Sequence, residues 1–126
     1  MTTMPHDELS IDLKSENRGA ALLFKLRGSL DLATSPTVRA ALSDAQKTKK
    51  DVIVDLTQLE FLDSTGLGAL IGAHRRAAEH GGSLRLIVRE GPIFRLLTIT
   101  GLIRVLAVYH TVDDALKNQA RVIVAP

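Results

Sequence analysis

The segment from Asp63 to Gly68 (Asp-Ser-Thr-Gly-Leu-Gly) holds one carboxylate, two hydroxyls and two glycines within six residues. Serine and threonine hydroxyls in such a segment can cap a helix, accept a phosphoryl group or, with a base beside them, act as nucleophiles. Gly66 and Gly68 have no side chains, so we expect another surface to approach the backbone closely there. The simpler alternative is that Asp63 or Ser64 only caps a helix. A cap needs fewer polar groups than this segment holds, so the composition weakens the capping alternative.

The patterns on either side predict where this segment lies. Residues 52–56 form a short β-branched run that is typical of a buried strand. After a connector, apolar residues recur at helical spacing from Leu67 to Ala78. We therefore expect the segment at the carboxyl end of a strand and at the N-terminus of a helix. Open α/β sheets bind ligands and partners at that edge, where free N–H groups and the positive end of the helix dipole lie.

Strands and helices alternate along the rest of the chain. The expected strands are 9–13, 20–26, 52–56, 84–88 and 105–108, with a turn at 16–19 that makes a hairpin of the first two. The expected helices begin at Pro36 with Ser35 as N-cap, near Leu67, at Ile93, and after a cap at Thr111 or Asp113. This order predicts an α/β fold with a central mixed sheet of four to five strands, an initial hairpin and about four flanking helices.

The composition excludes several classes of function. The chain has 126 residues and no cysteine, which excludes disulfides, thiol nucleophiles and zinc knuckles. Sixteen Lys and Arg oppose fourteen Asp and Glu, and the four aromatic residues are not interleaved with basic runs, so we expect no direct nucleic-acid partner. The N-terminus does not resemble a signal peptide, and no apolar stretch approaches the roughly 20 residues of a membrane span, so we expect a cytoplasmic protein with no membrane partner.

Residues 52–68 (Val-Ile-Val-Asp-Leu-x-x-Leu-x-Phe-Leu-Asp-Ser-Thr-Gly-Leu-Gly) resemble the signature of STAS domains, and in particular of bacterial anti-sigma factor antagonists. Upstream, Gly-Ser-Leu-Asp at 28–31 resembles the family's Gly-Glu-Leu-Asp turn, with Ser29 in place of the usual Glu. Downstream, residues 81–82, 93–97 and 100–102 fit the family in order and spacing. We therefore divide the chain into a flexible N-terminus (1–7), one STAS domain (8–118) and a C-terminal tail (119–126).

The resemblance implies a partner-switching function without enzymatic activity, cofactor or metal. In this family the unphosphorylated antagonist binds an anti-sigma factor that is also a serine kinase, and the sigma factor goes free. Phosphorylation at the position of Ser64 releases the antagonist, and a PP2C-type phosphatase resets it. A weak homodimer stays open as a further partner. The expected partner-binding residues are Asp31, Asp63, Ser64, Thr65, Gly66, Leu67 and Gly68.

The sequence also suggests three alternative functions. Within the same family, the chain could instead be an accessory or scaffold subunit of a stress complex or a transporter. A small dinucleotide-binding protein is suggested by Gly66-x-Gly68-x-x-x-Gly72, but eight to nine residues separate Leu56 from Gly66, whereas such glycines follow their strand directly. A hydrolase with Ser64 as its nucleophile is the third alternative, but the sequence around Ser64 has no G-x-S-x-G motif. The four histidines (His6, His74, His80 and His110) have no metal-ligand spacing.

Overall fold

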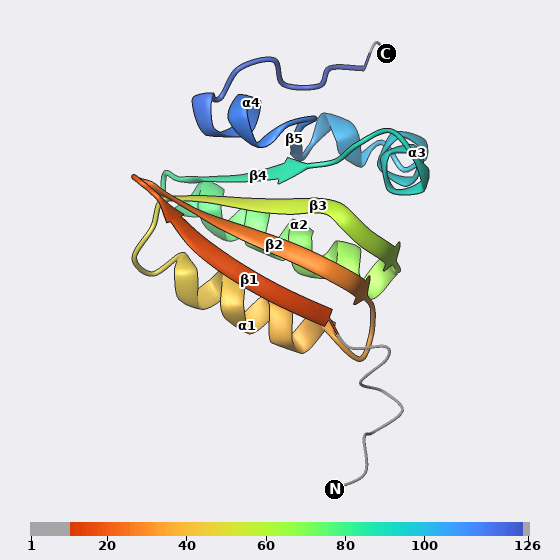
Figure 1. Cartoon of the computed structure of the whole chain (residues 1–126), viewed down its shortest axis with the longest axis horizontal. Helices are drawn as coiled ribbons and strands as arrows, with labels where there is room; N and C mark the ends of the chain where they lie inside the picture. Colours follow the sequence, from red (N-terminus) through yellow and green to blue (C-terminus); the bar gives the residue numbers. More distant parts are fainter. Residues whose placement is uncertain (1–10, 125–126) are drawn as a thin grey trace, which may run out of the picture.

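A five-stranded sheet, whose strands lie in sequence order, forms the centre of the computed structural model, which describes residues 11–124 (Figure 1). The strands are β1 (Ile11–Arg18), β2 (Ala21–Leu30), β3 (Asp51–Leu62), β4 (Ser83–Ile87) and β5 (Ala107–Tyr109). The β1–β2 hairpin is antiparallel and every other pairing is parallel. The predicted mixed α/β sheet with an initial hairpin is therefore confirmed.

Helices cover the two faces of the sheet unequally (Figure 1). The described helices are α1 (Ser35–Ala45), α2 (Ser64–Glu79), α3 (Pro92–Ile99), α4 (Val112–Lys117) and a 3-10 turn, η2 (Leu102–Arg104). The larger core joins strand residues such as Phe24 and Val54 to α1, α2 and α3. A smaller cluster on the other face joins Leu23, Ile53 and Tyr109 to Ala115 of α4. The larger core thus spans β2 to β5 under α1, α2 and α3, whereas α4 covers only part of the other face.

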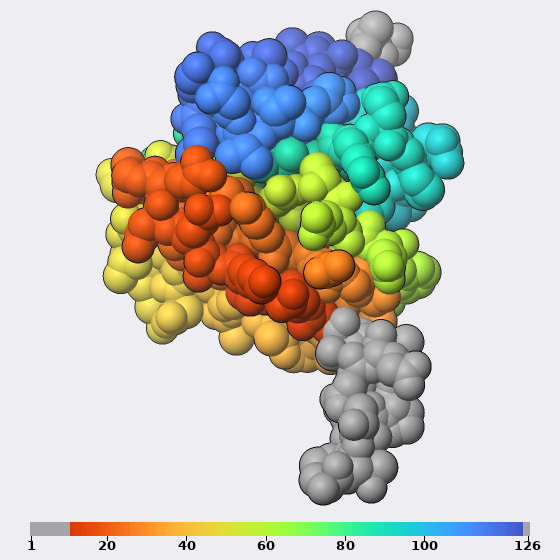
Figure 2. Space-filling view, viewed as in Figure 1, coloured from red at the N-terminus to blue at the C-terminus, as the bar shows by residue number. Residues whose placement is uncertain are grey.

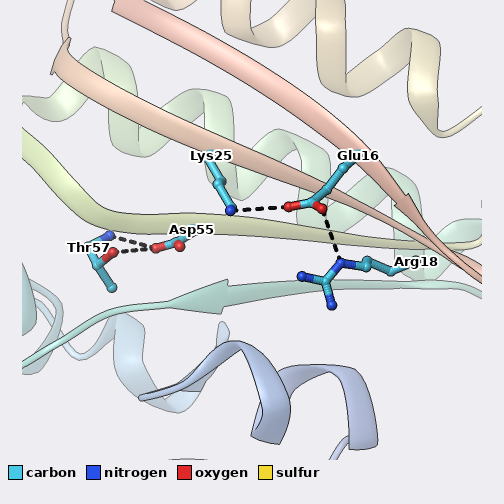
Figure 3. A network of polar contacts seen from close by, with 5 residues as sticks. All are labelled: Glu16, Arg18, Lys25, Asp55 and Thr57. Carbon is cyan, nitrogen blue, oxygen red and sulfur yellow. Dashed lines mark hydrogen bonds and ion pairs between the residues drawn. The ribbon is translucent and has the colours of Figure 1, made fainter.

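The rest of the second face is polar. Figure 2 shows β1 and β2, in red and orange, on the surface beside the blue α4. Glu16 lies 3.1 Å from the Nζ of Lys25 and accepts a hydrogen bond from Arg18 at 3.3 Å, while Asp55 accepts two hydrogen bonds from Thr57 (Figure 3). The pKa of Glu16 is lowered, mainly by the hydrogen bond from Lys25 and to a smaller extent by the one from Arg18. Charged side chains take the place of a helix on this part of the sheet.

The strand before the candidate segment is longer than predicted. We expected it to end at Leu56, with a connector after it, but β3 continues to Leu62. Its pairing with β2 shifts register between Lys25 and Arg27 and again after Gly28, and at each shift β3 carries one extra residue. Gly28, with φ +107°, adopts a conformation that other residues avoid. The connector is therefore a wrong prediction, and β3 leads directly to Asp63.

The edges of other elements also differ from expectation. Strand β1 extends through residues 16–18, where the sequence predicts the turn, and the turn lies at Gly19 and Ala20. At the other end, the backbone N–H of Val122 donates to the carbonyl of Val108 at 2.8 Å, and Val124 packs against the larger core. The flexible N-terminus predicted at 1–7, and the start of the first predicted strand, lie outside the described residues.

Candidate functional site

Asp63 joins the end of β3 to two other elements. One carboxylate oxygen, Oδ1, accepts a hydrogen bond from the backbone N–H of Gly66 at 2.9 Å, so Asp63 is the N-cap of α2. The other oxygen, Oδ2, accepts from the backbone N–H of Leu32 at 3.2 Å, in the loop between β2 and α1. The Asp63 N–H donates to the carbonyl of Leu30 at 3.2 Å. Asp63 thus fixes the start of α2 against the end of β2.

Asp31 orders the neighbouring loop from within. Its Oδ1 accepts hydrogen bonds from the N–H groups of Ala33 at 3.0 Å and Thr34 at 3.1 Å. The Thr34 hydroxyl donates to the carbonyl of Ser29 at 2.7 Å and accepts from the Asp31 N–H at 2.9 Å. The structure therefore brings Asp31 and Asp63 to one edge of the sheet, joined through the loop that holds Leu32.

Ser35 does not have the role that we predicted. The N-cap of α1 is Thr34, which makes no side-chain cap, and Ser35 is the first helical residue. Its side chain is 0% exposed, and its hydroxyl has no hydrogen-bond partner among the residues that the structure describes. The prediction fails because the Asp31 loop already satisfies the N–H groups ahead of the helix, and Ser35 turns into the core instead.

Ser64 is the first residue of α2 and its side chain is exposed. Thr65, next to it, is half-buried, and Leu67 is buried against the core. Gly68 is exposed, with open space where a side chain would stand. Ser64 and Gly68 therefore present an accessible surface at the start of α2, whereas Leu67 has a packing role.

Gly66 overturns one of our expectations. A Cβ at Gly66 would lie 2.5 Å from the carbonyl oxygen of Leu30 and 2.8 Å from side-chain carbons of Leu30 and Leu62. The close approach at Gly66 is thus made by the chain's own β2, and not by another molecule. The same contact removes the phosphate cradle that a dinucleotide fingerprint needs at its glycines. The predicted gap between the strand and these glycines is wrong, since β3 ends at Leu62, but the packing of Gly66 excludes a dinucleotide phosphate there directly.

Two exposed apolar side chains that we did not predict from the sequence belong to the same edge of the sheet. Leu32 is 74% exposed, and its backbone N–H donates the hydrogen bond to Oδ2 of Asp63. Phe61, which is 52% exposed, comes two residues before Asp63 and pairs with Ser29 across the sheet. The sequence did carry a signal for Leu32, since a large apolar residue within a short polar turn indicates an exposed apolar side chain. Together with exposed Ser64, they give this edge the mixed apolar and polar character of an interaction surface.

Within residues 11–124 there is no group of three or more His, Cys, Asp or Glu side chains that could hold a metal ion. The described part of the chain also contains no helix long and apolar enough to cross a membrane. His110 is engaged instead by the backbone, with its Nδ1 2.8 Å from the carbonyl oxygen of Val88.

Comparison with known proteins gives a consistent result. Residues 12–115 match the family model described as the STAS domain. An anti-sigma-B factor antagonist from Listeria monocytogenes is 30% identical over 114 residues, which cover 89% of this chain and 98% of the relative. The crystal structure of an anti-sigma factor antagonist from Mycobacterium paratuberculosis superposes with a TM-score of 0.80 at 24% identity, covering 93% of this chain and 97% of that one. The Bacillus cell fate determinant SpoIIAA in its phosphorylated form gives a TM-score of 0.64 at 23% identity, covering 85% and 98%.

Proposed function

This chain belongs to the STAS-domain family, and we propose that it is an anti-sigma factor antagonist that is switched by phosphorylation of Ser64. In its unphosphorylated form it binds an anti-sigma factor that is also a serine kinase, and the sigma factor goes free. Phosphorylation of Ser64 releases the complex, and a PP2C-type phosphatase restores the binding form. The observation that carries the proposal is the exposed serine at the first position of α2, at the carboxyl edge of the sheet.

The shape of this edge supports a protein partner. Exposed Leu32 and Phe61 supply apolar contact area, and Gly68 leaves the α2 surface free of a side chain. Asp31 and Asp63 use oxygens for hydrogen bonds within the chain, so their contribution to binding is to hold the loop and the helix start in place. We assign Ser64, Thr65 and Gly68 to direct contact with the partner.

The same geometry explains why a phosphoryl group would act on the complex. Phosphorylation adds roughly −1.5 to −2 charges and three acceptor oxygens. The first turn of α2 has backbone N–H groups without intrahelical acceptors, and Asp63 caps only one of them, so the free protein can accommodate the group. In the complex, the added charge and bulk would meet a packed partner surface and not free N–H groups. Asp63 already makes this region negative, which adds to the repulsion. A loss of about 2.7 kcal/mol would weaken binding about a hundredfold.

We propose no enzymatic activity for the chain itself. In the switch the partner kinase supplies the base, metal and nucleotide, so Ser64 has only to be accessible. Because the kinase would transfer the γ-phosphoryl group of ATP to the Ser64 hydroxyl, we propose that both proteins act in the cytoplasm, where ATP is available.

The test is incubation with the cognate anti-sigma kinase and ATP, followed by mapping of the phosphorylated residue by mass spectrometry. We expect phosphate on Ser64 and none after Ser64→Ala. Ser35→Ala is the matched control, because Ser35 also begins a helix but is buried. Phosphate on another residue, or undiminished labelling of Ser64→Ala, would reject the proposed switch.

A further inference from the structure

A pocket lies at the end of the molecule away from Ser64. It has a volume of about 250 Å³ and lies between the C-terminal ends of α1 and α2. Because α2 has 16 residues and an α-helix rises about 1.5 Å per residue, roughly 24 Å separate its two ends. We call this pocket the basic pocket. The polar and cationic side chains of its lining that carry the argument are Gln46, Lys47, Lys49, Lys50, Arg76 and His80.

The positive charge of the basic pocket exceeds what its surroundings neutralise. The C-terminal ends of two helices contribute about one negative charge in total, which lysines near a helix end ordinarily offset. Asp44 pairs with Lys47 at 3.8 Å, and both side chains are exposed. Against these stand four cationic side chains of the lining, three lysines and Arg76. About two positive charges are therefore left over, more than helix capping requires.

The guanidinium of Arg76 is held in the pocket wall and has one buried nitrogen without a hydrogen-bond partner among the described residues. Its Nε donates to Oε1 of Gln46 at 3.0 Å, and Gln46 in turn donates through Nε2 to the carbonyl of Ala73 at 2.8 Å. These contacts fix the guanidinium in the wall of the pocket. Its Nη2 is nevertheless buried without a hydrogen-bond partner among residues 11–124. The positive charge of this buried guanidinium is therefore only partly offset by hydrogen-bond acceptors, and an oxyanion in the pocket that Arg76 lines would offset it further.

His80 adds a polar group to the same wall. Its Nδ1 lies 2.8 Å from the carbonyl oxygen of Arg76. Because a carbonyl only accepts, Nδ1 carries a hydrogen, and Nε2 is left as the second polar atom of the ring. Lys49 is also held, since its Nζ donates to the carbonyl of Gly19 at 3.0 Å. Arg76 and Lys49 are thus held in place by other parts of the chain, whereas Lys47 and Lys50 are exposed.

We propose that the basic pocket binds a small multivalent phosphate, either as the free anion or as the phosphate group of a metabolite. Its volume lies below the range of about 300–1,000 Å³ that is usual for drug-sized ligands, which favours a compact anion. Arg76 offers the planar fork that matches phosphate oxygens, and the lysines add point charges around it. This site is separate from Ser64, so it does not depend on the proposed switch.

The experiment is calorimetric titration of the full chain with pyrophosphate at low ionic strength, where screening is weakest. We expect saturable binding with one site per chain, which Arg76→Gln weakens about tenfold or more. Lys50→Ala, at an exposed position, should weaken it about threefold and keeps the test valid if Arg76→Gln fails to fold. A parallel titration with ribose 5-phosphate separates the two sources: tighter binding than pyrophosphate assigns a metabolite, and weaker binding assigns the free anion.

The matched control is Lys14→Ala, which removes an exposed lysine from β1, outside the pocket. We expect it to leave the affinity for pyrophosphate unchanged. Absence of saturable binding by the folded wild-type chain up to millimolar pyrophosphate would overturn the proposal. An equal loss of affinity in Lys14→Ala and Lys50→Ala would also overturn it, because that result indicates general attraction to the chain's charge.

Discussion

Both long helices that cover the larger core begin with a serine, yet the two serines have opposite environments. Ser35 opens α1 and is 0% exposed, whereas Ser64 opens α2 and is exposed. The aspartates that precede them differ as well: Asp31 bonds within its own loop, while Asp63 caps α2 and also bridges to Leu32. A helix-start serine is therefore not in itself a modification site. Exposure to solvent determines whether such a serine can be modified. The hydrogen bonds of the preceding aspartate determine which backbone contacts a substitution there would break.

The largest effect on stability should come from the contact between the start of α2 and the end of β2. Gly66→Ala places a Cβ 2.5 Å from the carbonyl oxygen of Leu30, so we expect a loss of about 2–3 kcal/mol in the free energy of unfolding. Gly68→Ala is the matched control, because nothing lies within 4 Å of its Cβ. It should gain about 0.5–1 kcal/mol from the higher helix propensity of alanine. Urea denaturation measures both, and equal stabilities would contradict the packing that we describe.

The two aspartates should be distinguishable by which amides they protect. Asp63→Ala removes the cap of α2 and the bridge to the neighbouring loop, and we expect a loss of about 1–2 kcal/mol. Hydrogen exchange should also become faster at the N–H of Leu32. Asp31→Ala should instead expose the N–H groups of Ala33 and Thr34. Indistinguishable exchange patterns in the two variants would show that the bridge through Asp63 is not formed in solution.

The smallest effects should be at the two serines that begin these helices. The Ser35 hydroxyl has no partner among the described residues, so Ser35→Ala removes an unsatisfied polar group and should raise the stability by about 1 kcal/mol. Ser64→Ala, at the exposed position, should change it by less than about 0.5 kcal/mol. Thermal unfolding of the two variants beside the wild type is the measurement. A destabilised Ser35→Ala protein would mean that this hydroxyl is bonded after all.

The order of elements was predictable from the sequence because most of the strands and helices carry one clear period each. Strand β3 was not, and its core residues show why: Val52, Val54 and Leu56 are two apart, but Leu59 and Leu62 are three apart. Each register shift against β2 inserts one residue between inward positions, so the alternation disappears while the strand continues. A bulge that depends on pairing with another strand leaves no local signal.

The residues of the site were predictable in type, but their division of roles was not. The motif from Asp63 to Gly68 indicated both the N-cap and a glycine with close contacts. It could not indicate that Gly66 contacts Leu30, because that contact is made by residues 36 positions away along the chain. The burial of Ser35 and the exposure of Leu32 likewise depend on how the Asp31 loop folds onto the sheet.

The central claim is that charge at Ser64 controls partner binding, and one titration tests it most directly. The affinity of the anti-sigma factor should be measured by calorimetry for the unphosphorylated chain, for the chain phosphorylated on Ser64, and for Ser64→Ala. We expect phosphorylation to weaken binding about a hundredfold, while Ser64→Ala retains the affinity of the unphosphorylated chain. Equal affinities for the phosphorylated and unphosphorylated chains would contradict the account.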